Sequence, residues 1–360
     1  ISYICKGPAT INNTMSHSIL IIYTGGTIGM KTNPETGALA PFNFDQIETE
    51  VPELKKFGIG IDTLTFSPLI DSSNITPDEW IRMATVIKEH YYKYDGFVVL
   101  HGTDTMSYSA SALSFMVQNL DKPVIFTGSQ IPIGVPRTDG KENLITSVEI
   151  AAAKGSDGKP LVPEVCVYFE NHLFRGNRTS KYSADHFNAF RSYNYPPLAE
   201  AGIDIKYNLP YIRKMDAFLP SFDITTELSP YVAVLKLYPG ISRTIVRGIL
   251  ANPEVKGVVM ETFGSGNAPM YEWFLDEIRE AIKRDVIILN TTQCSVGTVN
   301  MEIYDTGKAL KSIGVVSGGD MTVEAAITKM MYLLGKNLDK EQLIHQLSAP
   351  IRGEMTHPGI

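Results

Sequence analysis

Cysteine is scarce in this chain: there are three among 360 residues, Cys5, Cys166 and Cys294, and no Cys-x-x-Cys pair. An odd number without paired spacing argues against a disulfide framework and suits a reducing compartment. The seven histidines also lack the His-x-x-x-His and His-Glu-x-x-His spacings that are typical of zinc sites. We therefore expect no structural disulfide and no metal site.

Long apolar runs and basic clusters are also missing. No run approaches the roughly 18 apolar residues of a membrane-spanning helix, and residues 1–14 lack the charged start and apolar core of a secretory signal. The formal net charge of −7 argues against broad electrostatic binding to nucleic acid or to an anionic membrane. We expect a cytoplasmic protein that acts on a small molecule, with residues 1–17 as a disordered extension.

The first regular feature is an apolar run at residues 19–23 that does not alternate with polar residues, which predicts a buried parallel strand. The run is followed by Thr24-Gly25-Gly26-Thr27. This stretch has neither the Gly-x-x-x-x-Gly-Lys-Ser/Thr spacing of a phosphate-binding loop nor the spacing Gly-x-Gly-x-x-Gly. The two glycines let the backbone turn sharply, so that Thr27 can be lifted off the strand end toward a ligand. Thr27 is therefore a candidate nucleophile. The simpler alternative is a polar residue in a tight turn.

Short apolar runs alternate with helical patterns in both halves of the chain, which is typical of βαβ units and a parallel sheet. The length exceeds the usual size of a single core, so we expect one large and one smaller α/β domain. The alternation weakens where prolines accumulate before residue 230. We predict a catalytic N-terminal domain over 18–207, a linker over 208–229 and a C-terminal domain over 230–360.

The expected elements follow from these patterns. Strands are predicted at 61–66, 96–100, 123–127, 165–169, 232–237, 255–260 and 286–289. Helices are predicted at 143–153, 241–250, 271–284, 323–334 and 340–347, and another begins at Thr76-Pro77-Asp78-Glu79 with a capping box. The polar segment 31–41 predicts a hairpin or flap over Thr27.

Polar side chains follow four of the predicted strands, namely Thr27, Asp71-Ser72, Thr103-Asp104 and Ser129. In an open parallel sheet the ligand crevice lies at the carboxyl ends of the strands. Each residue alone has a simpler explanation as a helix or turn cap, but together they suit a ligand that carries an ammonium and a carboxylate. Asp71 and Asp104 would hold the ammonium; Ser72 and backbone N–H groups would hold the carboxylate.

A threonine hydroxyl is a weak nucleophile unless a neighbouring base takes its proton. The candidates are a desolvated lysine or a tyrosinate. Lys181 lies in a loop rich in Gly and Asn, where a solvated surface lysine is the simpler alternative. Burial beside Thr103 and Asp104 would instead make it an amine that exchanges protons with a hydroxyl. His101 ends a buried strand and is expected to be a packed histidine, and Cys294 is expected to be structural or to contact a ligand.

Two motifs carry a resemblance to a known family: Thr24-Gly25-Gly26-Thr27-Ile28-Gly29 and His101-Gly102-Thr103-Asp104-Thr105. With them the chain resembles the bacterial L-asparaginases, most closely the type I, cytoplasmic branch. The resemblance extends over nearly the whole chain from about Ser18. Further matching segments lie at 71–73, 127–130, 175–181, 238–240, 263–269 and 318–322.

The resemblance implies a two-domain α/β fold and hydrolysis of L-asparagine to L-aspartate and ammonia, with L-glutamine as a poorer substrate and no metal or organic cofactor. Thr27 would attack the side-chain amide carbon and form an acyl-enzyme. Thr103, Asp104 and Lys181 would form a second triad that activates the nucleophile or the hydrolytic water.

The same resemblance implies the substrate contacts and the assembly. Asp71, Ser72 and Asp104 would bind the charged ends of the substrate, with Ser129 near the amide, and Thr103 would also contact the substrate. The family usually forms a tetramer of intimate dimers, in which the small domain of one subunit completes its neighbour's site. A homo-oligomer, dimer or tetramer, is therefore expected, without nucleic acid or membrane as partner.

The chain departs from the family pattern at two places. Ala38 and Leu39 stand where many members carry a flap tyrosine, so no partner is assigned to Thr27. Ser180 and Glu261 stand where some type I members use a threonine and an arginine to bind asparagine at an allosteric site. The sequence therefore does not support an inherited allosteric site.

Two other functions remain open. The amidase subunit of a tRNA-dependent amidotransferase belongs to the same superfamily but normally carries an extra N-terminal domain. A two-lobed amino-acid-binding protein without chemistry would explain the polar crevice but not the need for Lys181. Ammonia release separates an enzyme from a binding protein.

Overall fold

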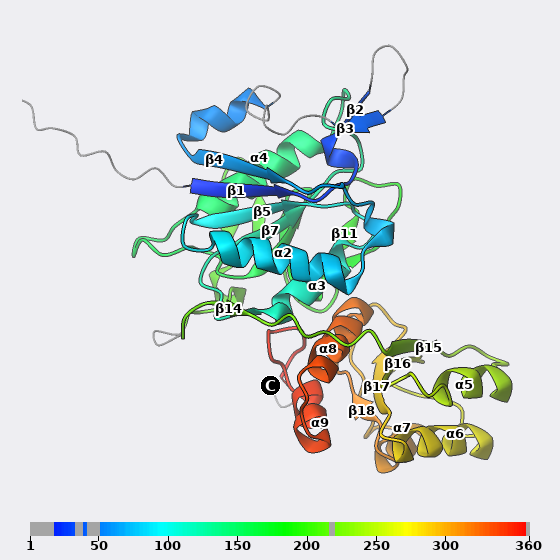
Figure 1. Ribbon diagram of the computed structural model, residues 1–360. Helices are drawn as coiled ribbons and strands as arrows, with labels where there is room; N and C mark the ends of the chain where they lie inside the picture. The colour runs from blue at the N-terminus through cyan, green and yellow to red at the C-terminus, as the bar shows by residue number, and fades with distance from the viewer. Residues whose placement is uncertain (1–17, 33–38, 42–50, 216–219, 358–360) are drawn as a thin grey trace, which may run out of the picture.

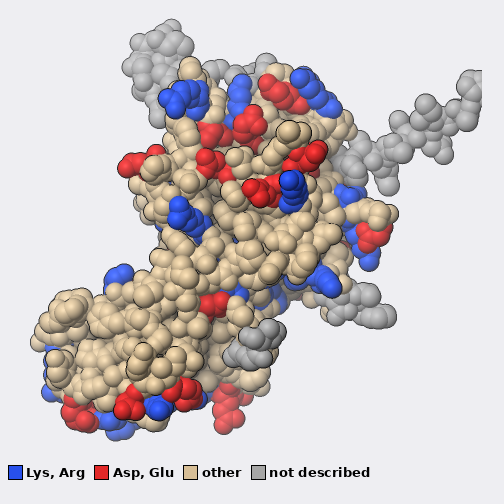
Figure 2. Space-filling model, turned by 180° about the vertical axis from the view of Figure 1, so that it is seen from behind, with Lys and Arg blue, Asp and Glu red and all other residues tan. Residues whose placement is uncertain are grey.

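The computed structural model describes residues 18–32, 39–41, 51–215 and 220–357 (Figure 1). The predictions for residues 1–17, Cys5 and Ala38 lie outside these ranges. The chain forms a larger and a smaller body, which are visible from the front and from behind (Figures 1 and 2). Both are α/β domains, as predicted.

The large domain is built on an eight-stranded sheet with the order β13-β12-β9-β8-β7-β5-β1-β4. The strands are β1 (Ser18–Tyr23), β4 (Gly60–Thr65), β5 (Gly96–Leu100), β7 (Val124–Thr127), β8 (Val165–Phe169), β9 (His172–Arg175), β12 (Ala199–Ala201) and β13 (Ile205–Tyr207). The neighbouring strands β4, β1, β5, β7 and β8 are parallel to one another. The strands β9, β12 and β13 add an antiparallel edge next to β8. The mostly parallel sheet is confirmed.

Helices cover both faces of this sheet. Helices α2 (Pro77–His90) and α3 (Met106–Met116) lie on one face and α4 (Gly140–Ala152) on the other (Figure 1). β1 is buried on both sides, because Leu20 and Ile22 join the core next to α2 and α3 whereas Ile21 and Tyr23 join the core next to α4. A strand between two cores has no solvated face, which explains its unbroken apolar sequence.

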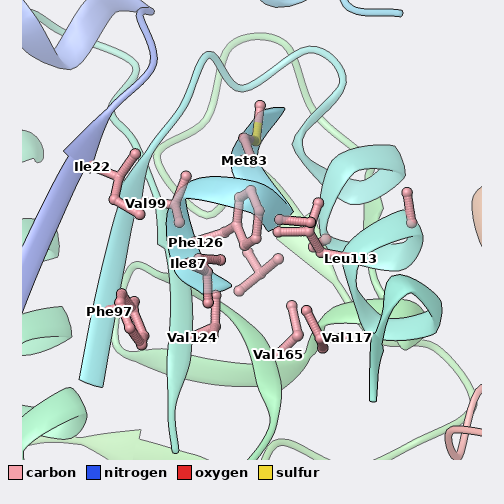
Figure 3. Packing of buried hydrophobic residues seen from close by; sticks show 14 of the residues in the cluster. Ile22, Met83, Ile87, Phe97, Val99, Leu113, Val117, Val124, Phe126 and Val165 are labelled. Carbon is pink, nitrogen blue, oxygen red and sulfur yellow. The ribbon is translucent and has the colours of Figure 1, made fainter. Parts of the chain in front are cut away.

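Figure 3 shows the core next to α2 and α3. Ile22, Val99 and Phe126 come from three neighbouring strands and lie close to Met83 of α2 and Leu113 of α3. All five side chains are fully buried, and each such side chain contributes on the order of 1.5–3 kcal/mol. This packing makes the sheet a rigid base for the turns at its carboxyl edge.

The start of α2 follows the predicted capping box. The Thr76 N–H donates to the Glu79 carboxylate at 2.9 Å, and proline occupies the first helical position. Trp80 and Ile87 are buried against the sheet. The local sequence therefore sets both the beginning of the helix and its buried face.

The small domain has a four-stranded parallel sheet with the order β15-β16-β17-β18. Its strands are β15 (Val232–Lys236), β16 (Gly257–Thr262), β17 (Ile287–Thr292) and β18 (Val316–Ser317), and its helices are α5 (Arg243–Leu250), α6 (Glu272–Lys283), α7 (Asp305–Ser312), α8 (Val323–Gly335) and α9 (Lys340–Ser348). Short α7 and β18 escaped prediction, because eight and two residues carry little periodicity.

Helix α3 of the large domain packs against α8 of the small domain (Figure 1). The rings of Phe115 and Tyr332 stack at this junction with centroids 5.9 Å apart, and Phe115 belongs to the core of the small domain.

None of the described helices is long and apolar enough to cross a membrane.

The remaining short elements lie between these strands and helices in the chain. They are η1 (Thr27–Gly29), β2 (Met30–Thr32), β3 (Leu39–Pro41), η3 (Pro52–Phe57), η4 (Ser72–Asn74), β6 (Val117–Gln118), η5 (Gly176–Arg178), β10 (Ser180–Lys181), β11 (Phe190–Arg191), η6 (Leu209–Tyr211) and β14 (Asp223–Ile224). β2 and β3 pair antiparallel, which confirms the hairpin after Thr27. β14, inside the predicted linker, pairs with β6 of the large domain.

Candidate active site

Three turns meet at the carboxyl edge of the large sheet. Gly26 has a φ of 90°, and a Cβ atom there would lie 2.6 Å from the Gly102 Cα. A Cβ atom on Gly102 would in turn lie 2.5 Å from the Ser72 hydroxyl. Because side chains do not fit at these two glycines, the backbones can touch. The contacts bring the turns that carry Thr27, Ser72 and Thr103 together.

Lys181 reaches this edge from another part of the chain. Its Nζ donates hydrogen bonds to Thr103 Oγ1 at 2.8 Å and to Asp104 Oδ1 at 2.7 Å. The Lys181 side chain is 18% exposed and that of Asp104 is 65% exposed. The predicted loop position of Lys181 is wrong, since the residue lies on the two-residue strand β10, paired with β11. An amine held between a hydroxyl and a carboxylate can pass a proton between them.

Gln130 is a contact that the sequence did not reveal. Its Oε1 accepts a hydrogen bond from the Thr103 hydroxyl at 3.3 Å, while its Nε2 donates to the carbonyls of Ala184 and His186, both at 3.2 Å. The Gln130 N–H donates to the Asp139 carboxylate at 2.9 Å, and burial raises the pKa of Asp139. The Thr103 hydroxyl thus lies between Lys181 and a glutamine that is itself anchored. Nothing in the motif around residue 130 distinguishes this side chain.

Thr27 stands at the start of η1 and is partly buried. Across the residues that the structure describes, its hydroxyl makes no hydrogen bond. Tyr23 lies beneath this turn, with its hydroxyl 3.4 Å from the Gly26 carbonyl. Burial raises the pKa of Tyr23 to about 12, so its phenol stays protonated at neutral pH and does not supply a tyrosinate base. The proton acceptor for Thr27 therefore stays unassigned.

The other predicted substrate contacts differ in exposure. Asp71 is exposed and accepts a hydrogen bond from the Ser73 N–H at 3.0 Å, which lowers its pKa and caps η4. Ser72 is buried, and its carbonyl accepts from the Thr105 hydroxyl at 2.7 Å. Ser129 is buried, and its hydroxyl has no hydrogen-bond partner among the described residues. Ser129 thus has unused hydrogen-bonding capacity.

His101 is a packed histidine, as predicted. Its Nδ1 lies 2.7 Å from the Gly102 carbonyl and its Nε2 lies 2.9 Å from the Ser109 hydroxyl, which accepts from the Trp80 indole N–H at 2.9 Å. Burial lowers the pKa of His101 to about 4, so the ring is neutral near pH 7. This network holds the turn before Thr103.

Ser180 and Glu261, which depart from the family's allosteric pattern, form other contacts. The Ser180 hydroxyl donates to Glu324 at 2.9 Å, and Glu261 pairs with Lys236 at 3.4 Å. Cys294 is an exposed free thiol. Within the described ranges, no group of three or more His, Cys, Asp or Glu side chains is arranged to hold a metal ion.

Fold and site together define a two-domain α/β protein with a hydroxyl, amine and carboxylate cluster at a sheet edge. Family models for "Asparaginase, N-terminal" and "Glutaminase/Asparaginase C-terminal domain" match residues 18–213 and 231–347. The chain belongs to the asparaginase family.

Individual relatives agree with this assignment. L-asparaginase 1 of Escherichia coli is 46% identical over 345 residues, which cover 94% of this chain and 98% of that protein. The human 60 kDa lysophospholipase is 42% identical over 364 residues, covering 95% of this chain and 62% of that protein. The crystal structure of L-asparaginase I from Vibrio cholerae matches with a TM-score of 0.86 at 42% identity, over 95% of this chain and 99% of that one.

Proposed function

We propose that the protein hydrolyses L-asparagine to L-aspartate and ammonia. The observation that carries the proposal is the position of Lys181 Nζ, 2.8 Å from the Thr103 hydroxyl and 2.7 Å from the Asp104 carboxylate, at the edge where the Thr27 turn also lies. The family membership and the E. coli relative support the choice of substrate.

In the proposed reaction, the Thr27 hydroxyl attacks the side-chain amide carbon and loses its proton to a base. The tetrahedral intermediate collapses when the C–N bond breaks, and the nitrogen leaves as ammonia after protonation. Water then adds to the threonine ester, with Thr103, Lys181 and Asp104 accepting and returning protons, and L-aspartate departs. Backbone N–H groups at the turns would stabilise each oxyanion, by about 3 kcal/mol per donor.

The substrate's charged ends would be held by the predicted anchors. Asp71 and Asp104 would bind the α-ammonium, and both carboxylates are exposed enough to receive a ligand. Ser72 would bind the α-carboxylate. Ser129 would contact the amide, a role that its buried, unpartnered hydroxyl supports.

The proposed assembly is a homodimer or homotetramer, with the small domain of one subunit completing its neighbour's site. Its support is a set of exposed apolar side chains on the small domain: Tyr238, Met270, Tyr271, Val296, Ile303 and Tyr304. The rear view also shows a broad area without charged side chains on this domain (Figure 2). Exposed tyrosine and methionine side chains are enriched at protein interfaces. The two described cysteines are free, which supports the proposed cytoplasmic location.

The test is ammonia release from L-asparagine by the purified protein, measured over a wide range of substrate concentration beside Thr27→Ala and Thr27→Ser. We expect robust release that disappears in Thr27→Ala and persists in part in Thr27→Ser, because only the serine keeps a hydroxyl. L-glutamine should be hydrolysed more slowly. Retained asparagine binding without ammonia release would favour the non-catalytic binding protein, and a near-normal Thr27→Ala variant would remove the nucleophile assignment.

A further inference from the structure

We infer that the small domain positions the proton-transfer lysine of the large domain. Lys181 contacts Thr103 and Asp104 within the large domain, but the residues that lead to it are held by the small domain and by the C-terminal end of the chain. The inference rests on the proposed function, because it assumes that Lys181 takes part in the reaction.

The first contact is a buried ion pair between the domains. Arg178, three residues before Lys181, donates to Asp320 Oδ2 at 2.9 Å, and the two side chains are 2% and 10% exposed. Asp320 follows strand β18 of the small domain. Burial lowers the pKa of Arg178, and Asp320 opposes this effect. Loss of the carboxylate would leave a buried guanidinium without its counter-charge, so the pair strongly favours one position of η5.

The second contact is next to the lysine. The Ser180 hydroxyl donates to Glu324 Oε2 at 2.9 Å, and Glu324 is buried in the first turn of α8. Helix α8 packs along α3, whose first turn directly follows Thr103 and Asp104. One helix pair therefore supports both the lysine and the groups that it must meet.

The C-terminal strap, residues 349–357, completes this support. The Asn177 side-chain amide donates to the Arg352 carbonyl at 3.1 Å, so the strap holds η5 directly. The N–H and hydroxyl of Thr356 donate to the Asp320 carboxylate at 2.7 and 2.6 Å. The strap thus contacts both sides of the domain junction.

The strap is itself anchored in the small domain. Lys329 of α8 and Glu354 of the strap form an ion pair at 2.6 Å, and both side chains are completely buried. The Lys329 ammonium also donates to the carbonyls of Leu347 and Ala349, at 3.0 and 2.7 Å. These bonds satisfy a charge that would otherwise be costly to bury.

The strand that carries Lys181 gives it little support of its own. β10 has two residues and pairs with the equally short β11. A displacement of a reacting group by about 1 Å can cost 10²-fold in rate. The contacts from Asp320, Glu324 and the strap therefore decide whether the lysine amine stays within reach of Thr103.

The experiment compares kcat, KM and the thermal unfolding midpoint of full-length variants. Ser180→Ala should lower kcat roughly tenfold at an almost unchanged KM and midpoint, because it removes one hydrogen bond to a carboxylate. Ser180→Thr should restore kcat, since it returns the hydroxyl. Asp320→Asn should lower kcat by about 10²-fold. If Asp320→Asn does not fold, Thr356→Val provides a milder variant, because it removes only the hydrogen bond from the Thr356 hydroxyl to the Asp320 carboxylate.

The control is Arg243→Lys, which alters an arginine–glutamate pair of 2.8 Å inside the small domain and should leave kcat unchanged. The inference is overturned if Lys181→Met abolishes turnover while Ser180→Ala and Thr356→Val keep the normal kcat. The inference is also overturned if Ser180→Thr does not restore the kcat of the parent protein. Full turnover by Lys181→Met is a separate result, because it removes the assignment of Lys181 in the proposed function.

Discussion

The two threonine turns of the site differ in how their hydroxyls are held. The Thr103 hydroxyl accepts from Lys181 and donates to Gln130, whereas the Thr27 hydroxyl has no hydrogen-bond partner in the described part of the chain. A hydroxyl inside a hydrogen-bonded chain is prepared to relay protons, and one without partners is available to attack a substrate. The difference supports separate roles for two chemically identical side chains.

The surroundings of the turns differ in the same way. Behind Thr103, the neutral ring of His101 links the turn to Ser109 of α3. After Thr27, the chain continues into the β2–β3 hairpin, whose connecting residues 33–38 lie outside the described ranges. The Thr103 turn is thus tied into the core, while the Thr27 turn joins the core to a hairpin.

The largest expected effect tests the amine beside Thr103. Lys181→Met should lower kcat by about 10²–10⁴-fold with a small change in KM, because the proton relay is lost. Thr103→Val should act similarly, and the double variant should be no worse than the more affected single variant, since both residues act as one unit. Steady-state ammonia release measures all three.

Lys340→Met is a suitable control, because Lys340 forms an ion pair with Asp285 at 2.7 Å on the surface of the small domain. An unchanged maximal rate in Lys181→Met would return Lys181 to a structural role. Fully multiplicative losses in the double variant would show that Thr103 and Lys181 act independently.

The next effect concerns the histidine behind Thr103. The folded-state pKa of His101 is about 4, below its ordinary value of 6.5. Between these two pH values the unfolded chain binds a proton that the folded chain does not bind, so stability falls as pH falls from 6.5 to 4. The loss from this residue is about 3 kcal/mol. His101→Gln should therefore show a smaller drop in unfolding midpoint between pH 7 and pH 4.5.

Thermal unfolding at the two pH values measures this prediction, with His345→Gln as the control because His345 lies exposed in the last turn of α9. An equal pH-dependent drop in His101→Gln and in the parent protein would contradict it. The Thr103 turn would then owe its stability to other contacts.

The smallest expected effect concerns Gln130. Its hydrogen bond from Thr103 is long, at 3.3 Å, so Gln130→Leu should lower kcat only about fivefold. Gln342→Leu, at an exposed position of α9, is the matched control. A loss as large as that of Lys181→Met would mean that Gln130 belongs to the relay itself, and the comparison between the two turns would have to include it.

Much of the fold followed from local sequence patterns. The strand at 96–100 and the capped start of α2 were predicted, because each depends on a few neighbouring residues. The strands β9 and β12 were missed, since segments of three or four residues have too little alternation to be recognised. The domain boundaries at 207 and 230 stay predictions.

Sequence by itself also determined which polar residues stand at the strand ends, because a turn must follow each buried strand. Only the tertiary structure decided which of them touch. The Lys181 amine meets Thr103 across 78 positions, and Arg178 meets Asp320 across 142. Residues that are so far apart in the sequence leave no local pattern. Their contacts arise from the packing of α3 against α8 and from the glycines that let the turns approach.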